Sequence, residues 1–370
     1  MKLKKLTIAC GGTGGHFYPG LSIARTFQKE GGEVTLLLSG KHSLNQAKIA
    51  ASYDIKSLQI PSSPRSLRPR GLFRFIKDLL SGIIKARKVF KEIRPDAFLA
   101  MGSFASIPSA LAARSRKVPL FLHEGNARIG KANILLSRWA KVLAIAFPPV
   151  NEHKSKVQIK CIGMPVRPEL LENKYTKKEA IEILNIKYKT KFSSERPSLL
   201  IFGGSQGTQI FNEIVPKQIS NLDSTNIQVI HLTGAGKLEM VNQGYQNTNC
   251  SKIVLESSPD MDLFYQASDI IICRSGGSSL AELAIFSKFA VLVPYPYSAD
   301  GHQEDNANFQ QSSGGAQLIN NTDFTDQACE TFLKTWLENP SAIKEKAERA
   351  GSLAKPHASK DMLALINTHL

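Results

Sequence analysis

A glycine-rich run that ends in a histidine lies close to the start of the chain. The run Gly11-Gly12-Thr13-Gly14-Gly15-His16 follows an apolar segment, Leu6 to Cys10, and precedes Pro19. A strand, a glycine turn and a helix that begins at the proline would expose backbone N–H groups suited to a phosphate. Neutral imidazole is a suitable general base near pH 7, and the positive end of a helix favours its neutral form. The motif predicts a diphosphate-bearing substrate with His16 as a base beside it.

Two other interpretations of this turn have to be weighed. Glycine-rich turns between strand and helix are common in α/β proteins and can be no more than tight turns. A dinucleotide site needs a third glycine, where this chain has Phe17, and an acidic residue after the second strand to hold the ribose. That strand ends in Ser39-Gly40-Lys41. The sequence therefore argues against NAD.

The elements that position this motif belong to a large protein with a strong positive charge. The chain has 370 residues, 42% of them hydrophobic, and a formal net charge of +16. Its length suits two domains, since single cores stop growing at about 250–300 residues. We expect no signal peptide, no spanning helix and no thiolate metal site, and hence a cytoplasmic protein with an anionic partner. Of the five cysteines, Cys10, Cys161 and Cys273 lie in apolar runs and are expected in the core.

Much of the positive charge falls in one amphipathic segment. Apolar residues recur at helical spacing from about Leu72 to Phe90, interleaved with Lys and Arg, which predicts a basic amphipathic helix. The helix either packs on the core with a solvated basic face or docks on an anionic membrane. The residues expected to dock are Leu72, Phe73, Phe75, Arg68 and Arg70. Nucleic acid is a weaker alternative, because no recognition motif accompanies the charge.

Apolar strands alternate with helical patterns along the whole chain, which predicts parallel sheets. The expected strands are 5–10, 34–38, 97–101, 118–123, 142–146, 198–203, 227–232, 252–256, 270–273 and 290–294. Prolines at 165 and 168 suggest a hinge. The sequence thus predicts an α/β protein of two Rossmann-like, doubly wound domains, 1–165 and 166–370, that face a central cleft. It leaves open whether the final helix, about 358–370, packs back on the first domain.

The second half carries further turns that could hold a nucleotide. Gly203-Gly204-Ser205-Gln206-Gly207 again follows an apolar strand, as does the segment Arg274 to Glu282. In the latter, Ser279 and Glu282 have the spacing of a capping box, but the same helix start could face a diphosphate. Asp260-Met261-Asp262 has the D-x-D spacing of a cation site. We favour a role for Asp260 as a helix N-cap and expect no metal.

These motifs together resemble the MurG family of peptidoglycan glycosyltransferases. The matching residues are Gly11 to Gly20, His123-Glu124-x-Asn126, Pro165-Val166-Arg167, Gly203 to Gly207, Arg274-Ser275-Gly276, Glu282 and Gln303. The resemblance covers essentially the whole chain. It implies a GT-B fold and an inverting enzyme without cofactor that moves GlcNAc from UDP-GlcNAc to the C4 hydroxyl of lipid I. It also implies a peripheral protein of the cytoplasmic face of the inner membrane, with roles in cell wall synthesis, cell shape and cell division.

The resemblance also assigns site residues. Thr13, Gly14 and Gly15 would contact the donor sugar or the acceptor pyrophosphate, and Asn126 the transferred sugar. The UDP would be held by Arg167, Ser205, Gln206, Ser275, Gly276, Gly277, Glu282 and Gln303. We expect His16 to deprotonate the acceptor and Glu124 to help orient it. Helix N-termini and Arg167 would stabilise the leaving UDP.

The chain departs from the family pattern mainly on the acceptor side. Where the family has G-G-Y-x-S-x-P, this chain has Gly102-Ser103-Phe104-Ala105-Ser106-Ile107-Pro108, and Gly125 replaces a glutamine. His302 stands beside Gln303 where some members have two glutamines, and we do not expect it to be catalytic. Two other functions stay open: a related GT-B transferase with another lipid acceptor such as diacylglycerol, or a membrane-docked UDP-sugar-binding protein without turnover.

Overall fold

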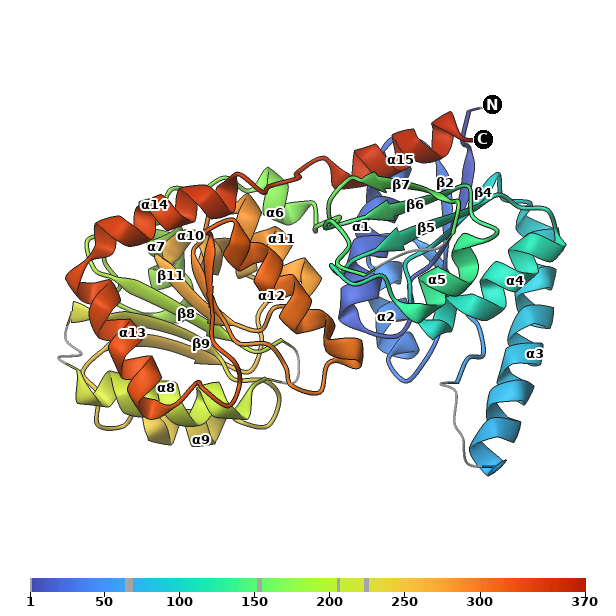
Figure 1. Cartoon of the computed structure of the whole chain (residues 1–370). Coiled ribbons are helices and arrows are strands. Elements are labelled where there is room, and N and C mark those ends of the chain that lie inside the picture. Colours follow the sequence, from blue (N-terminus) through green and yellow to red (C-terminus); the bar gives the residue numbers. More distant parts are fainter. Residues whose placement is uncertain (1, 64–68, 152–154, 205–206, 223–225) are drawn as a thin grey trace. The chain divides into compact units, whose positions relative to one another are not determined.

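The chain folds as two compact α/β units. The structure is a computed structural model that describes all residues except 1, 64–68, 152–154, 205–206 and 223–225. Unit 1 comprises Met1–Pro168 and Lys355–Leu370, and unit 2 comprises Glu169–Ala354 (Figure 1). Each unit is built around its own parallel sheet, as expected for an α/β protein of two Rossmann-like domains.

The sheet of unit 1 has seven strands in the order β3-β2-β1-β4-β5-β6-β7. They are β1 (Lys5–Ala9), β2 (Glu33–Leu38), β3 (Lys56–Gln59), β4 (Ala97–Ala100), β5 (Leu120–Glu124), β6 (Val142–Ile145) and β7 (Gln158–Cys161). The helices are α1 (Gly14–Lys29), α2 (Ser43–Ala51), α3 (Pro69–Ile93), α4 (Ile107–Ser115) and α5 (Lys131–Ser137). The strand order reverses direction at β1, between β2 and β4. Ligands bind at this kind of position in doubly wound sheets, beyond the carboxyl ends of the strands.

Successive side chains of the strands in unit 1 point to opposite faces of the sheet, so each face has its own hydrophobic core. Leu6 and Ile8 of β1 face one buried cluster, which they share with Phe17 of α1. Ala9 faces a second cluster on the other side of the sheet, together with Phe90 of α3. Because both faces are covered, strands such as β4 and β5 are buried at every position, as is usual for parallel sheets.

Unit 2 repeats this architecture with six strands in the order β10-β9-β8-β11-β12-β13. They are β8 (Ser198–Phe202), β9 (Gln228–Leu232), β10 (Ser251–Leu255), β11 (Ile270–Cys273), β12 (Ala290–Leu292) and β13 (Ala316–Leu318). The helices are α6 (Glu169–Glu172), α7 (Lys177–Tyr188), α8 (Gln209–Asn221), α9 (Leu238–Gly244), α10 (Met261–Ala267), α11 (Gly277–Ile285), α12 (His302–Ser312), α13 (Asp326–Glu338) and α14 (Pro340–Gly351).

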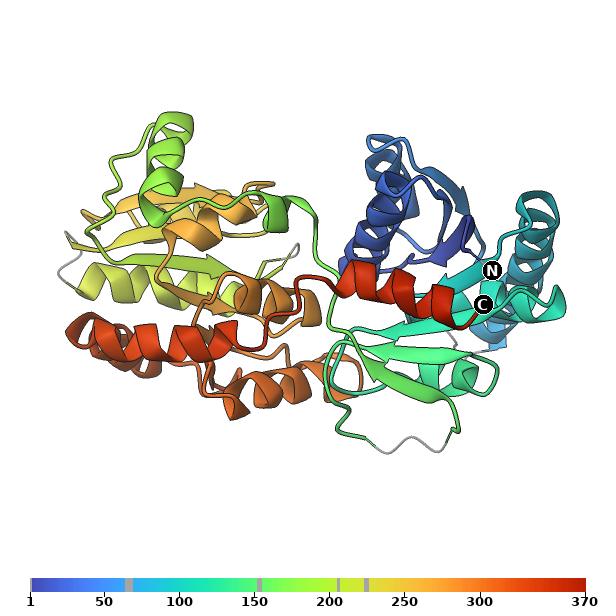
Figure 2. The ribbon, with the colours of Figure 1, turned by 90° about the horizontal axis from the view of Figure 1, so that it is seen from above.

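The last helix, α15 (Ala358–Thr368), belongs to unit 1. It lies beside α1 (Figure 2), and Met362, Leu363 and Ile366 enter the first buried cluster of that unit. The side-chain oxygen of Asn367 accepts a hydrogen bond from the backbone of Leu3 at 2.8 Å. The two ends of the chain are therefore joined within one unit.

The ten expected strands are all present, and three more were missed. The missed strands are β3, β7 and β13, which are short and lie at sheet edges. They contain polar residues and little continuous apolar sequence, so the hydrophobic pattern does not reveal them. Cys161 lies in β7 and is exposed, so its expected place in the core was wrong, whereas Cys10 and Cys273 are buried. Among the described residues, no helix is long and apolar enough to cross a membrane.

Candidate active site

The histidine of the first glycine turn is held by its neighbour. The Oγ1 atom of Thr13, the N-cap residue of α1, lies 2.9 Å from Nδ1 of His16. The carbonyl oxygen of Thr13 also accepts backbone hydrogen bonds from His16 and Phe17. Thr13, Gly14 and Gly15 are exposed and His16 is half-buried, so the histidine is fixed at one ring nitrogen at the mouth of the turn.

Helix α1 begins earlier than expected. It starts at Gly14, so Pro19 lies inside it and the prediction that the proline opens the helix was wrong. The backbone around this helix start packs so closely on its neighbours that a side chain would clash. A Cβ at Gly11 would lie 2.1 Å from the backbone nitrogen of Ser39. A Cβ at Gly20 would lie 2.4 Å from Cβ of Cys10. The glycine run is therefore itself the helix start.

The loop after β4 closes over the histidine. Gly102 has φ +90°, and a Cβ built there would lie 3.4 Å from Nε2 of His16 and 3.5 Å from Nδ2 of Asn133. Ser103 follows with φ 66° and ψ 149°, a conformation essentially restricted to glycine. This is the position at which the family pattern has a second glycine, so the chain keeps the backbone path despite the serine. Its Oγ accepts a hydrogen bond from Ala105 at 3.3 Å.

A buried carboxylate organises the loop after β5. Glu124 is only 5% exposed and accepts four hydrogen bonds. Its Oε1 receives the backbone N–H and the side-chain amide of Asn126, at 3.1 and 3.2 Å. Its Oε2 receives Gly130 N–H at 2.8 Å and Nδ2 of Asn133 at 3.0 Å. All four donors belong to the loop and the start of α5, so this carboxylate positions Asn126 and Asn133.

His123 and Gly125, on either side of Glu124, have packing roles. His123 is buried and its Nε2 donates to the carbonyl oxygen of Gly163 at 3.0 Å. Burial lowers its pKa to about 4, so it is neutral at pH 7. A Cβ at Gly125 would lie 2.6 Å from the methyl group of Met164. A glutamine at this position would require Met164 to move.

Arg167 lies against helix α1. Its guanidinium carbon is 5.8 Å from the ring centre of Tyr18, two residues after His16. The preceding carbonyl, of Val166, accepts a hydrogen bond from the buried hydroxyl of Ser22. The segment before Pro168 is thus fastened along α1, which brings Arg167 to the same helix as His16.

In unit 2, the turn after β11 leads into α11 with Gly276 as N-cap. No side chain caps this helix, so of the two alternatives left open for Ser279 and Glu282 the capping box is not formed. Instead Oε2 of Glu282 accepts a hydrogen bond from the buried hydroxyl of Tyr265 at 2.9 Å. The first backbone N–H groups of α11, around Gly277, have no partner within the helix and can receive an anion.

Gln303 at the start of α12 is tied to the same turn. Its backbone carbonyl accepts a hydrogen bond from the buried hydroxyl of Ser275 at 2.7 Å. Its side-chain oxygen accepts from the backbone of Tyr295 at 2.9 Å. The buried amide of Asn306 donates to the carbonyl of Ser275 at 3.0 Å. The structure therefore brings Ser275, Gly276, Gly277, Glu282 and Gln303 to one edge of the second sheet; Ser205 and Gln206 lie outside the described residues.

The basic residue of this turn, Arg274, makes hydrogen bonds that connect several loops of unit 2. Its guanidinium donates to the carbonyls of Val293 and Pro294, to the amide oxygen of Asn321 and to the hydroxyl of Thr208. Burial lowers its pKa to about 10, which leaves it charged at pH 7. Arg274 therefore fixes the ends of neighbouring strands.

The D-x-D residues have protein partners. The carboxylate of Asp260 lies 2.6 Å from Nζ of Lys187 and also accepts from the hydroxyl of Tyr188. Asp262 accepts from the amide of Asn173 at 2.8 Å. Asp260 is the residue before α10, but its side chain caps no backbone N–H, so its expected capping role was wrong. Within the described ranges, no group of three or more His, Cys, Asp or Glu is arranged to hold a metal.

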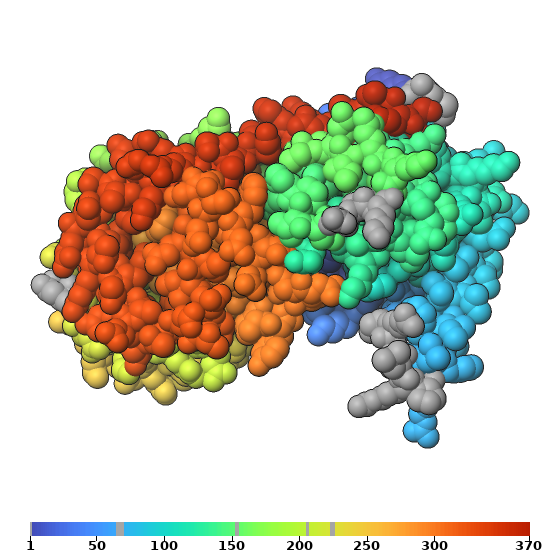
Figure 3. Space-filling model, in the orientation of Figure 1, coloured from blue at the N-terminus to red at the C-terminus, as the bar shows by residue number. Residues whose placement is uncertain are grey.

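Helix α3, which is light blue in Figure 3, presents an apolar stripe on the surface of unit 1. Its exposed apolar side chains are Leu72, Phe73, Ile76, Leu80 and Ile84. The helix also carries exposed cations, which include Arg70, Lys77 and Lys88. Phe75 is half-buried, and Arg68 lies outside the described residues. The stripe is longer than the three apolar residues predicted from the sequence.

Sequence reasoning missed several residues of these sites. Asn133, Tyr265 and Asn306 are buried amide or hydroxyl donors whose acceptors lie 9, 17 and 31 residues away, in other elements. Gly102 was noted only as part of a family motif. No local spacing marks such residues, because each acquires its role from a contact between different elements.

Comparison with known proteins agrees with this arrangement. The glycosyltransferase family 28 N-terminal domain matches residues 6–145, and the family 28 C-terminal domain matches residues 198–362. A relative from Pseudoalteromonas translucida (strain TAC 125) is 34% identical over 99% of this chain and 97% of its own length. One from Psychromonas ingrahamii (strain DSM 17664 / CCUG 51855 / 37) is 32% identical over 98% of both chains.

Both relatives are named UDP-N-acetylglucosamine–N-acetylmuramyl-(pentapeptide) pyrophosphoryl-undecaprenol N-acetylglucosamine transferase. Among solved structures, MurG of Acinetobacter baumannii superposes with a TM-score of 0.79 at 28% identity and covers 99% of each chain. The two sheets and their helix N-termini thus have the GT-B architecture of a known glycosyltransferase. The chain belongs to glycosyltransferase family 28 and, within it, to the MurG family.

Proposed function

We propose that this protein is an inverting glycosyltransferase that moves GlcNAc from UDP-GlcNAc to the C4 hydroxyl of the muramyl sugar of lipid I, giving lipid II. The observation that carries the proposal is His16, held at Nδ1 by Thr13 and lying with Nε2 beside Gly102. A sugar hydroxyl is a weak nucleophile, so its attack on the anomeric carbon needs a base within hydrogen-bond reach. The names of the relatives supply the acceptor and the donor.

The Thr13 contact is compatible with the tautomer of His16 that a general base needs. A threonine hydroxyl can accept a hydrogen bond as well as donate one. When Nδ1–H donates to Thr13 Oγ1, the lone pair lies on Nε2, on the side of Gly102. Nε2 then takes the proton of the acceptor hydroxyl as the new C–O bond forms and the bond to UDP breaks. Since the attack comes from the face opposite UDP, the anomeric configuration inverts.

In unit 2 we assign the UDP to the turn between β11 and α11. The leaving diphosphate gains negative charge, which the backbone N–H groups at the start of α11 can stabilise. Glu282, held by Tyr265, is suited to accept from the ribose hydroxyls, and Gln303 is fixed nearby through Ser275. The family resemblance assigns Arg167 to the UDP as well. This assignment leaves Thr13, Gly14, Gly15 and Asn126 for the transferred sugar and the acceptor.

The substitution His16→Ala tests the base. We expect a fall in kcat of about 10²–10⁴ on a lipid I analogue, with UDP-GlcNAc binding retained. His42→Ala is a matched control, because His42 is an exposed histidine of the same unit at the start of α2. Near-normal turnover of the His16 variant would show that another group takes the proton.

Two alternatives are separated by acceptor assays. Transfer to diacylglycerol but not to lipid I would identify a related enzyme with another lipid acceptor. Tight UDP-GlcNAc binding with no transfer to any lipid-linked acceptor would identify a binding protein without turnover. The placement of His16 beside Gly102 favours a transferase over the binding protein, because it provides a base for an acceptor hydroxyl. The names of the relatives favour lipid I over another lipid acceptor.

We further propose that the apolar stripe of α3 docks on the anionic cytoplasmic face of the inner membrane. Phe73 is 73% exposed and Leu80 56%, with exposed cations farther around the helix. Withdrawing such a side chain from lipid costs about 1.5–3 kcal/mol, so Phe73→Ser with Leu80→Ser should reduce vesicle binding at least about tenfold. Activity on a soluble acceptor analogue should be unchanged. Unchanged binding to vesicles containing anionic lipid would refute the docking proposal.

A further inference from the structure

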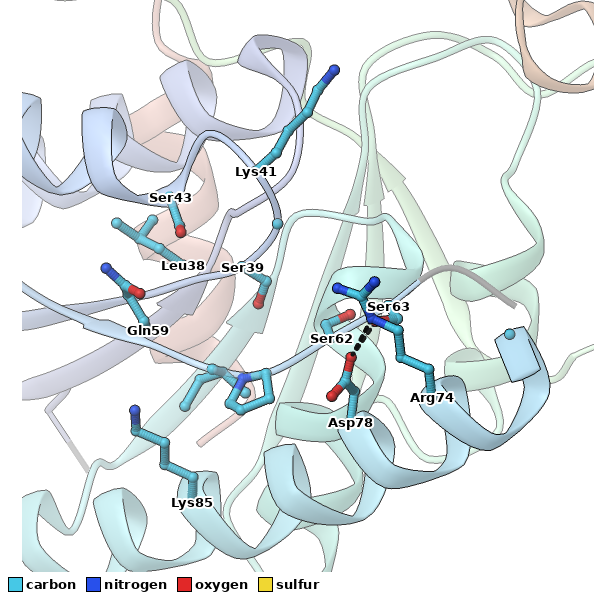
Figure 4. A pocket seen from close by; sticks show the side chains of 14 residues that line it. Leu38, Ser39, Lys41, Ser43, Gln59, Ser62, Ser63, Arg74, Asp78 and Lys85 are labelled. Carbon is cyan, nitrogen blue, oxygen red and sulfur yellow. Dashed lines mark hydrogen bonds and ion pairs between the residues drawn. The ribbon is translucent and has the colours of Figure 1, made fainter. Parts of the chain in front are cut away.

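A large pocket opens at the carboxyl ends of β2 and β3 in unit 1 (Figure 4). We call it the β2–β3 pocket; its volume is about 780 Å³. It is lined by Leu38, Ser39, Gly40, Lys41, Ser43, Gln59, Ile60, Pro61, Ser62, Ser63, Gly71, Arg74, Asp78 and Lys85. Pockets of roughly 300–1,000 Å³ hold small ligands in proteins. None of the roles proposed above uses it.

The wall of this pocket touches the turn that carries His16. The backbone N–H of Gly12 donates to the carbonyl oxygen of Ser39 at 3.0 Å. A Cβ at Gly40 would lie 3.8 Å from the Cα of Gly12. Because β1 and β2 are adjacent and parallel, their carboxyl ends lie at the same edge of the sheet. A ligand at His16 could therefore extend directly into the β2–β3 pocket.

The pocket is positively charged. Arg74 and Lys85 enter from α3, as Figure 4 shows, whereas Lys41 lies at the rim, on the turn after β2, with its side chain pointing away from the other lining residues. The carboxylate of Asp78 is engaged by Arg74 at 3.8 Å and accepts a hydrogen bond from Ser63. Neither Lys41 nor Lys85 has a carboxylate partner in the part of the chain that the structure describes. The two lysines are thus available to an anionic ligand.

The other lining residues indicate what kind of anion fits. Leu38 and Ile60 are buried and, with Pro61, give the pocket an apolar floor. Ser39 and Ser62 add hydroxyl groups. A compact diphosphate has no use for an apolar floor and is better served by backbone N–H groups at a helix start. A peptide combines apolar side chains, amide groups and carboxylates, and matches this lining.

The chemistry of the acceptor places such a peptide here. In a muramyl sugar the peptide hangs from the lactyl ether on C3, the carbon next to the C4 hydroxyl that attacks. When that hydroxyl lies at Nε2 of His16, the peptide leaves the sugar ring beside the glycine turn. We propose that the β2–β3 pocket binds the peptide of the acceptor, with Lys85 in the pocket and Lys41 at its rim as the cations that pair with its carboxylates. This inference rests on the proposed transferase function.

The experiment compares two soluble, short-chain acceptors that share the muramyl sugar and pyrophosphate, one with the pentapeptide and one without it. The double variant Lys41→Gln/Lys85→Gln should raise KM for the peptide-bearing acceptor about three- to tenfold. KM for the peptide-free acceptor and for UDP-GlcNAc should not change. The control Lys48→Gln/Lys56→Gln removes two exposed lysines of the same unit, from α2 and the opposite end of β3, and should alter neither. Thermal unfolding of both variants checks that they fold.

Each other outcome overturns the inference. An equal rise in KM for both acceptors would assign the lysines to the pyrophosphate, and an unchanged KM would leave the peptide without contact to the pocket. If the unsubstituted protein transfers sugar to neither acceptor, the proposed function fails as well. That failure is recognisable because it does not depend on the variants.

Discussion

Replacing Glu124 by glutamine should destabilise unit 1 far more than an ordinary change of charge. The carboxylate accepts four hydrogen bonds, two at each oxygen, and is 5% exposed. The glutamine amide keeps one acceptor oxygen. Its NH₂ group replaces the second carboxylate oxygen and faces the two donors that this oxygen accepted from. Two buried donors lose their acceptor at about 1–3 kcal/mol each, and relief from burying a charge offsets part of this. We expect a net loss of about 2–4 kcal/mol in the free energy of unfolding.

Tryptophan fluorescence can isolate this effect. The chain has two tryptophans, Trp139 in unit 1 and Trp336 in unit 2. In a Trp336→Phe background, urea unfolding followed at Trp139 reports unit 1 alone. Glu92→Gln is the matched control, since Glu92 is exposed near the end of α3. A difference between the two variants below about 0.5 kcal/mol would refute the hydrogen-bond reasoning, because surface changes lie in that range.

Three further predictions concern other parts of the structure. Ser103→Gly should be more stable than Ser103→Ala by about 1–2 kcal/mol in urea unfolding, since only glycine adopts φ 66° and ψ 149° without strain. If the alanine variant were the more stable of the two, the backbone at Ser103 would not be strained. Burial lowers the pKa of His123 to about 4 and of His231 to about 3, so both are neutral in the folded protein. As the pH falls, these histidines take up protons in the unfolded chain before they do so in the folded protein. The free energy of unfolding therefore keeps its full value above about pH 6.5 and falls below it, by up to about 1.4 kcal/mol per pH unit for each histidine. Equal unfolding free energies at pH 7 and pH 5 would contradict this. Tyr265→Phe removes one hydrogen bond from the carboxylate of Glu282 and should raise KM for UDP-GlcNAc about three- to tenfold with kcat retained. An unchanged KM would argue against a role for this hydrogen bond in the donor site.

The elements that could be predicted from the sequence are those in which local pattern and tertiary structure agree. Strands such as β1 and β8 are mainly apolar and are followed by glycine turns, so both their extent and their parallel arrangement follow from the pattern. The start of α1 could not be placed, because it depends on the close approach of Gly11 to Ser39, which directly follows β2. Proline is a weaker signal of a helix start than this contact.

The site was predicted as a set of motifs, and the contacts between motifs were not. His16 and Asn133 are far apart in the sequence, but both lie next to Gly102. The spacing of Ser279 and Glu282 fits a capping box, yet Tyr265 competes for the carboxylate from another helix. Hydrogen bonds of this kind depend on tertiary distances, on which a linear pattern carries no information.

The docking of α15 has a consequence for biosynthesis. A ribosome makes unit 1 up to Pro168, then the whole of unit 2, and only afterwards Met362, Leu363 and Ile366, which enter the first core of unit 1. Throughout that interval the apolar surface around Phe17 and Leu21 lacks these three side chains. Nascent chains with uncovered apolar surface are prone to aggregate and to engage chaperones. The unit that begins synthesis first is thus completed last, while the unit made in between already has its entire sequence.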